Sequence, residues 1–198
     1  NACGGKKQSE IPYELAYLSG DEMQDYLHDM EFMQAFADLN RTVIKEVILD
    51  GMKLTEDDSF TTIHNYVDVN TMILRKGAVS AKKDERLLIP MNMRDGSLIC
   101  TGLGNEDWNC SAPHGAGRLM SRKDAFDSFT LSAFEKSMEG IFTTSVARDT
   151  IDECPMVYKP MEEIMNNIKE TVIVEKIIKP IYNFKASENA GGKKRGKE

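Results

Sequence analysis

The sequence contains no long hydrophobic run. Its longest apolar stretches, such as 171–174 and 87–89, are far shorter than the roughly 20 residues that a helix needs to cross a bilayer. Residues 1–8 are polar and contain glycine, so they lack the apolar stretch of a secretion signal. These features exclude a spanning helix, and we expect a cytoplasmic protein without membrane contacts.

Cysteines are also few, and the 25 basic residues are outnumbered by 32 acidic ones. The four cysteines are widely spaced and form neither a C-x-x-C pair nor a zinc-binding pattern, which is typical of reduced structural thiols. The net charge of −7 excludes a protein that coats nucleic acid through many phosphate contacts. Any contact with RNA must therefore come from a local patch.

The composition is that of an ordinary globular domain, with 41% hydrophobic and 29% charged residues. We predict a single domain over residues 1–186 and a disordered, glycine- and lysine-rich tail at 187–198. The chain begins with Asn1 rather than methionine, which suggests part of a longer protein.

Apolar residues at three- and four-residue spacing predict one long helix, or two consecutive ones, over residues 21–50. Ser19 and Glu22 have the spacing of a capping box at its start. The methionines of this segment lie on the apolar face, so we expect them in the core.

The remaining pattern alternates between strands and short helices. Residues rich in threonine, valine and isoleucine predict strands within 60–75, 86–90, 97–101 and 171–185. A helix is expected from Ser121 to about Glu139 and another after Pro160, while residues 102–117 form a long, candidate functional loop. Together these elements predict an α+β fold in which the long helix packs on a mixed sheet.

The most informative segment is 109–122. In it, His114 precedes a Gly-Ala-Gly tripeptide, whose small side chains let peptide N–H groups approach an anion closely. Arg118 and Arg122 are four residues apart, so on a helical turn they would share a face and could clamp phosphate oxygens. A neutral imidazole beside them is a competent nucleophile toward phosphorus. The spacing alone equally allows a loop at a helix start with a capping histidine.

Residues 114–122, His-Gly-Ala-Gly-Arg followed by Met-Ser-Arg, resemble the active-site signature of the RtcB-type RNA ligases. In that family the histidine carries GMP as a phosphoramidate. The resemblance therefore implies that His114 is the nucleophile and that Arg118 and Arg122 lie near the phosphates.

Two upstream segments carry the same resemblance. Residues 63–66 resemble a His-Asn-Tyr segment whose histidine binds manganese, and residues 75–78 resemble an Arg-Lys-Gly-Ala segment whose lysine is needed for activity. The resemblance implies that His64 is a manganese ligand and Lys76 a catalytic residue. Taken alone, the first would more often be a structural histidine and the second part of a basic turn.

Three further segments resemble nucleotide-binding parts of the family: 89–97, 152–159 and 183–185. The first departs from the family's Ile-Pro-Gly-Ser-Met-Gly pattern, with Met91, Asn92 and Arg94 in place of the first glycine, the serine and the last glycine, but retains a matching Ser97. In the other two, the resemblance implies Tyr158 and Lys185 as guanine contacts. The candidate nucleotide-binding residues are Asn92, Ser97, His114, Gly115, Ala116, Gly117, Tyr158 and Lys185.

The resemblance extends from about residue 11 to 186 and corresponds only to the later part of the family. The earlier Asp and Cys manganese pair and a second metal-binding histidine have no counterpart here, so an amino-terminal segment of the same domain is an expected partner. The resemblance implies a GTP- and manganese-dependent ligase that joins RNA 3′-phosphate or 2′,3′-cyclic phosphate ends to 5′-hydroxyl ends. Two alternatives remain open: a non-catalytic module that binds guanine nucleotide or RNA, and a histidine phosphotransfer protein.

Overall fold

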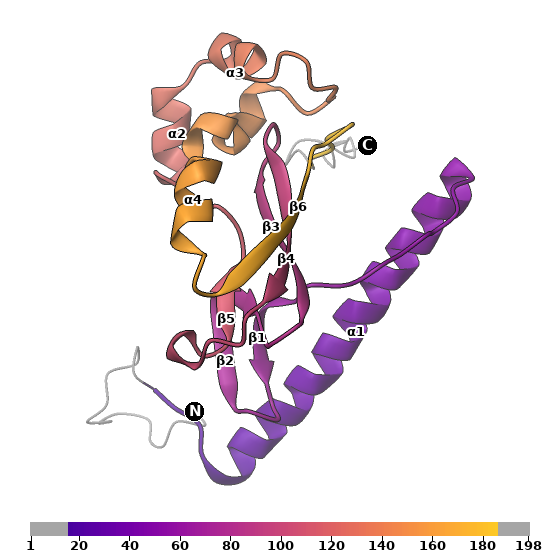
Figure 1. The fold of residues 1–198 in the computed structure, drawn as a ribbon, viewed down its shortest axis with the longest axis vertical. Coiled ribbons are helices and arrows are strands. Elements are labelled where there is room, and N and C mark those ends of the chain that lie inside the picture. Colours follow the sequence, from indigo (N-terminus) through magenta and orange to yellow (C-terminus); the bar gives the residue numbers. More distant parts are fainter. Residues whose placement is uncertain (1–15, 186–198) are drawn as a thin grey trace, which may run out of the picture. The chain divides into compact units, whose positions relative to one another are not determined.

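Residues 16–185 are described by a computed structural model, in which the chain divides into two units (Figure 1). The first unit contains the residues up to Thr61 together with Asn65–Lys76. The second contains Thr62–His64 and the chain from Gly77 onward. The tail expected at 187–198 lies outside the described residues, and the single-domain organisation stays a prediction.

The first unit is dominated by helix α1 (Gly20–Met52), which confirms the predicted long helix as one continuous element of 33 residues. Ser19 is its N-cap, but the Ser19 side chain makes no capping hydrogen bond, so the predicted capping box was wrong. The helix ends at Lys53, which adopts a left-handed conformation (φ 56°) and donates its N–H to the carbonyl of Asp50.

No residue of Gly20–Met52, all of which the structure describes, is buried. The expectation that its methionines lie in the core was therefore wrong: Met33 is 54% exposed, and Met23 and Met30 are only partly buried. Helical spacing identifies which residues share a face, but it does not show that another element covers that face.

Strands β1 (His64–Asp68) and β2 (Ile73–Ser80) are neighbours in one small sheet. In the first unit, the Asp68 carboxylate closes the turn between them by accepting the N–H groups of Asn70 and Thr71. Arg75 is buried there, with its guanidinium 3.8 Å from Asp68 and over the ring of Tyr66.

The second unit contains the sheet β3-β4-β6, formed by Arg86–Asn92, Gly96–Gly102 and Val172–Ile178. Both pairings in this sheet are antiparallel. The pairing of β2 with β5 (Ser111–Pro113) is also antiparallel, and β5 lies within the segment 102–117 that was predicted to be a loop. The α+β class is thus confirmed, although these sheets are antiparallel rather than mixed. Short connections, such as the one at 93–95, favour antiparallel neighbours.

Short helices complete the second unit: α2 (Arg122–Ser128), α3 (Leu131–Ser137) and α4 (Met161–Asn167), with 3-10 turns at Glu106–Trp108, Arg148–Glu153 and Pro155–Val157. The single helix predicted from residue 121 to 139 is therefore interrupted. Thr130 causes the break, because its hydroxyl caps a new helix by accepting the N–H of Ala133 at 3.2 Å.

Two apolar clusters stabilise this unit. One joins sheet residues, including Leu87, Ile89 and Leu98, to Ile164 and Ile168 at the end of α4. The other forms around Phe134, which is fully buried, and includes residues of α2 and of the 3-10 turns. Both clusters flank the segments that form the candidate site.

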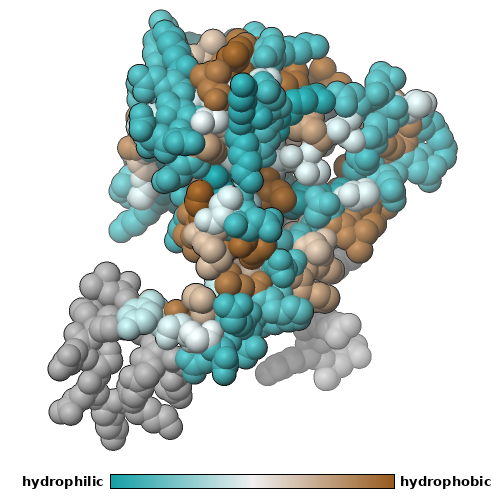
Figure 2. Space-filling model, turned by 60° about the horizontal axis from the view of Figure 1, so that its bottom comes forward, coloured by the Kyte–Doolittle hydropathy of each residue, from teal (hydrophilic) through white to brown (hydrophobic). Residues whose placement is uncertain are grey.

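Large apolar side chains also remain at the surface, including Ile173 at 53% and Phe142 at 70% exposure. On the face drawn in Figure 2, hydrophobic residues gather in patches among hydrophilic ones. Among the described residues, no helix has the length and hydrophobicity needed to cross a membrane.

Candidate functional site

His114 lies directly after β5, in the second unit, and its side chain is exposed. Its N–H donates to the carbonyl of Gly77 on β2 at 3.4 Å. Two residues later, the Ala116 N–H donates to the carbonyl of Pro90 on β3 at 3.1 Å. The loop is therefore anchored to both sheets, and the Ala116 N–H serves this anchoring rather than an anion.

Glycine suits two positions of this loop. A Cβ at position 115 would lie 3.1 Å from the carbonyl oxygen of Pro90, closer than nearly all real contacts, and Gly117 has a φ of 72°. A side chain at Gly115 would require a shift of a few tenths of an ångström between the loop and β3, and one at Gly117 would strain the backbone. The Gly-Ala-Gly tripeptide thus keeps His114 close to the sheet.

The structure brings together His64 and His114, which are far apart in the sequence. Their imidazole rings are stacked with centroids 5.3 Å apart and planes inclined by only 6°. Thr62, two residues before His64, supplies a hydroxyl that accepts the N–H of Leu88 at 2.9 Å and holds this segment on β3. Both rings are accessible to solvent.

A cavity of about 810 Å³ opens beside His114, a size typical of small-ligand sites. Most of the residues predicted from the sequence line it: Asn92, Ser97, His114, Gly115, Ala116, Gly117, Arg118, Arg122, Tyr158 and Lys185. His64 stacks on the pocket's histidine without lining the cavity. Lys76 belongs to the first unit, where it is an exposed residue of β2.

The two arginines do not share a helical turn, so the shared helical face that their spacing would allow is not formed. Arg118 forms an isolated bridge with Tyr158, and α2 begins only at Arg122. The intervening chain is held out of the helix because the Leu119 N–H donates to Val157 at 2.7 Å.

The arginines nevertheless converge on one carboxylate. The distance to Asp152 Oδ2 is 3.2 Å from Arg122 Nη1 and 3.9 Å from Arg118 Nη2. Arg118 also donates to the Asp152 carbonyl and lies over the Tyr158 ring, 5.3 Å from its centroid. The Arg122 side chain remains 72% exposed, against 25% for Arg118, so Arg122 is the arginine more accessible to a ligand.

Glu153 joins three lining residues and was not among the predicted site residues. Its carboxylate accepts from the Tyr158 hydroxyl at 2.8 Å, the Lys185 ammonium at 3.1 Å and the Arg118 guanidinium at 3.4 Å. Burial alone would raise the pKa of Glu153, but the hydrogen bonds from Tyr158 and Lys185 outweigh burial and lower it. Burial, and then the bond to Glu153, raise the pKa of Tyr158, so its hydroxyl remains a donor.

Asn92 and Ser97 lie on either side of the β3–β4 turn. The Asn92 amide oxygen accepts the N–H groups of Arg94 and Asp95, and its amide nitrogen donates to the Asp95 carboxylate at 2.8 Å. Asn92 therefore organises this turn at the edge of the cavity. Ser97 is half-buried on β4, opposite Ile178 of β6.

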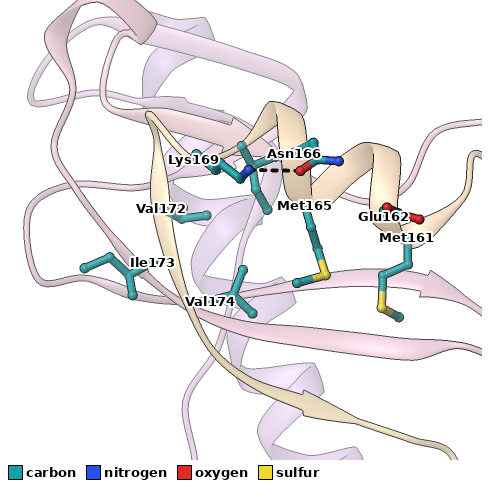
Figure 3. Close-up of a pocket in the computed structure, with 9 residues that line it drawn as sticks. Met161, Glu162, Met165, Asn166, Lys169, Val172, Ile173 and Val174 are labelled. Atoms are coloured by element: carbon teal, nitrogen blue, oxygen red, sulfur yellow. Dashed lines mark hydrogen bonds between the residues drawn. The ribbon is translucent and has the colours of Figure 1, made fainter.

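A second hollow of about 640 Å³ lies between α4 and β6 (Figure 3). Its lining is mainly apolar, with methionines of α4 facing valines of β6. The Lys169 ammonium at its edge donates to the Asn166 side chain at 2.9 Å. This hollow lacks a nucleophile and convergent cations, so the His114 pocket is the better candidate for chemistry.

Within residues 16–185, no group of three or more histidine, cysteine or acidic side chains could hold a metal ion. His64 and His114 supply two imidazoles at most, whereas protein sites for divalent transition metals generally use three or four ligands. The residues described therefore do not form a manganese site by themselves.

The fold and the pocket define an α+β protein with a histidine at a cavity lined by arginine and lysine side chains. The sequence profile of the family described as "tRNA-splicing ligase RtcB" matches residues 6–186, so the chain belongs to this family.

Similarity to individual relatives agrees with this assignment. The chain is 34% identical over 171 residues to the RNA-splicing ligase RtcB of Escherichia coli K12. The aligned region covers 77% of this chain and 42% of that protein. It is 30% identical over 196 residues to the tRNA-splicing ligase RtcB of Aeropyrum pernix, covering 80% and 40% respectively. The chain thus spans about two fifths of the length of these relatives.

Proposed function

We propose that this chain supplies the histidine and the nucleotide pocket of an RNA ligase. Its substrates would be GTP and RNA, such as tRNA halves or broken RNA, with 3′-phosphate or 2′,3′-cyclic phosphate ends joined to 5′-hydroxyl ends. The observation that carries the proposal is His114 in a cavity lined by Arg118 and Arg122. Family membership and the names of the relatives support the same activity.

The proposed reaction begins at His114. A ring nitrogen forms a bond to the α-phosphorus of GTP while the bond to the bridging oxygen breaks, so pyrophosphate leaves and a histidine–GMP adduct remains. The GMP group next passes to an oxygen of the RNA 3′-phosphate, and the bond between His114 and phosphorus breaks. A 2′,3′-cyclic phosphate end would first be opened by water, which breaks the bond from phosphorus to the 2′ oxygen and leaves a 3′-phosphate. The 5′-hydroxyl of the second RNA end then attacks that 3′-phosphorus and expels GMP.

The two arginines would contribute differently. Arg122 has a mostly exposed side chain that pairs with Asp152, so it can turn toward phosphate oxygens and stabilise their charge. Arg118 is held by Glu153, Asp152 and the Tyr158 ring, and it orders the pocket wall. Lys76 remains a proposed catalytic residue on the strength of its motif alone.

Manganese belongs to this proposal with His64 as one ligand. Because the described residues do not complete a metal site, the other ligands would come from outside this chain, which spans only 42% of the Escherichia coli relative. We propose that they lie in an amino-terminal segment of the same domain. That segment is accordingly a proposed partner of this chain.

The proposed function is tested with GTP labelled at the α-phosphate. We expect no label on the 198-residue chain alone with GTP and manganese, because one metal ligand leaves the ion largely in solvent. With the amino-terminal part of the domain supplied, we expect label on the protein that is acid-labile, as a phosphoramidate is. Nucleotide binding without any label in the complemented protein would instead favour the non-catalytic module.

Guanine preference provides a separate test at Lys185. A lysine ammonium can donate to the O6 carbonyl of guanine but meets an amino group at the same place on adenine. In the complemented protein, Lys185→Ala should narrow the preference for GTP over ATP by roughly tenfold, the equivalent of one charged hydrogen bond. Initial rates of protein labelling with each nucleotide measure this, and unchanged discrimination would remove Lys185 from the base site.

A further inference from the structure

Glu153 lies where three separate segments of the second unit meet. Its two carboxylate oxygens are shared among Arg118, which follows the His114 loop, Tyr158, which precedes α4, and Lys185, which follows β6. All four side chains line the same cavity. With only 18% of its side chain exposed, Glu153 faces these partners rather than solvent.

The arrangement of charge explains why a carboxylate is needed at this point. Arg118 and Lys185 bring two positive charges to one acceptor, and the Lys185 side chain is 41% exposed. Without an anion between them, the two cations would repel each other and the lysine would extend into solvent. The Lys185 backbone is fixed independently, because its N–H donates to the Ser145 hydroxyl at 2.7 Å.

We propose that Glu153 is a positioning residue of the nucleotide pocket, which holds Lys185 and Tyr158 in the orientation that recognises the base and Arg118 in the wall beside them. This inference rests on the proposed function, since it assumes that the pocket binds a guanine nucleotide. It adds a residue that acts through its neighbours and need not touch the ligand itself.

The state of the carboxyl agrees with this role. Its pKa is lowered by the hydrogen bonds from Tyr158 and Lys185, which outweigh burial, so Glu153 is a charged acceptor at neutral pH. Charge-assisted hydrogen bonds of this kind are shorter and stronger than neutral ones. Glutamine at the same position would keep the size and one acceptor oxygen but lose the charge.

The test compares GMP and AMP binding to the 198-residue chain and its Glu153→Gln variant by titration calorimetry. We expect the variant to bind GMP about tenfold more weakly while AMP binding changes little, which narrows the GMP-over-AMP ratio. The control is Glu163→Gln on α4, an exposed carboxylate that pairs with Lys159 outside the pocket. It should leave both affinities unchanged.

The ratio separates positioning from general stability. If Glu153→Gln weakened GMP and AMP binding equally, Glu153 would not position the groups that recognise the base, and the inference would be overturned. Unchanged GMP affinity and ratio would overturn it as well, while the proposed function would stand. Binding of neither nucleotide by the unaltered chain would also overturn the inference, whereas the proposed function is decided by the labelling experiment on the complemented protein.

Discussion

Alanine in place of His114 is expected to abolish the transfer of GMP from GTP to the protein. Among the described residues, the exposed imidazole of His114 is the one nucleophile that both stacks on His64 and lines the cavity beside Arg118 and Arg122. Removing it leaves no atom to form the bond to phosphorus. Labelling of the complemented protein should fall on the order of a thousandfold or more.

The sequence provides a matched control, since His28 is the remaining histidine and lies exposed on α1. His28→Ala should retain labelling at the level of the unaltered protein. Mass spectrometry of the labelled protein would locate the adduct. An adduct on any residue other than His114, or full labelling of His114→Ala, would contradict the proposed nucleophile.

Several elements could be predicted because they depend on local patterns. The long helix follows from apolar spacing, and α2 begins after Ser121 because that hydroxyl accepts the N–H of Asp124 at 3.2 Å. Strands β3 and β4 follow from β-rich residues on either side of a turn that Asn92 closes. In each case the interaction lies within a few residues of the pattern that indicates it.

Other features depend on long-range contacts that sequence patterns do not contain. The arginine spacing would allow both side chains to share one face of a helical turn, but Leu119 pairs with Val157 and Arg118 bridges to Tyr158 instead. Similarly, the apolar periodicity of α1 predicted a buried face, but none of the residues Gly20–Met52 is buried. Residue spacing does not determine which remote segment competes for a backbone N–H.

The candidate site shows the same division. Its residue types were identified by motif, and the structure brings ten of the predicted residues to one cavity. The role of Glu153 was missed, although it lies in the Asp-Glu-Cys-Pro segment. Two of its three donors, Arg118 and Lys185, come from distant parts of the chain, and only Tyr158 is close to it in sequence. The sequence did contain a signal. Cationic residues that share one pocket need acidic counter-charges, and the acidic pair Asp152 and Glu153 can provide them.

The second large effect is expected at Gly96, where β4 begins at the edge of the cavity. Gly96 has a φ of 87°, and a Cβ there would overlap the backbone carbonyl of Ile178 on β6. Gly96→Ala therefore combines left-handed strain with a clash that only backbone movement can relieve, at a cost of about 3 kcal/mol or more. Because Ser97 pairs with Ile178, the same movement would also distort the pocket.

Gly140 allows the strain and the clash to be separated. It has a similar φ of 84°, but a Cβ added there would meet no atom within 4 Å. Gly140→Ala should cost only the conformational strain, about 1 kcal/mol, and leave GMP binding unchanged. Thermal unfolding monitored by circular dichroism measures the difference, at roughly 2–4 °C per kcal/mol for a chain of this size. Equal losses of stability in the two variants would show that β4 and β6 do not approach closely at Gly96. A larger loss of stability in Gly96→Ala, together with weaker GMP binding, would show that the β4–β6 contact determines the shape of the nucleotide pocket.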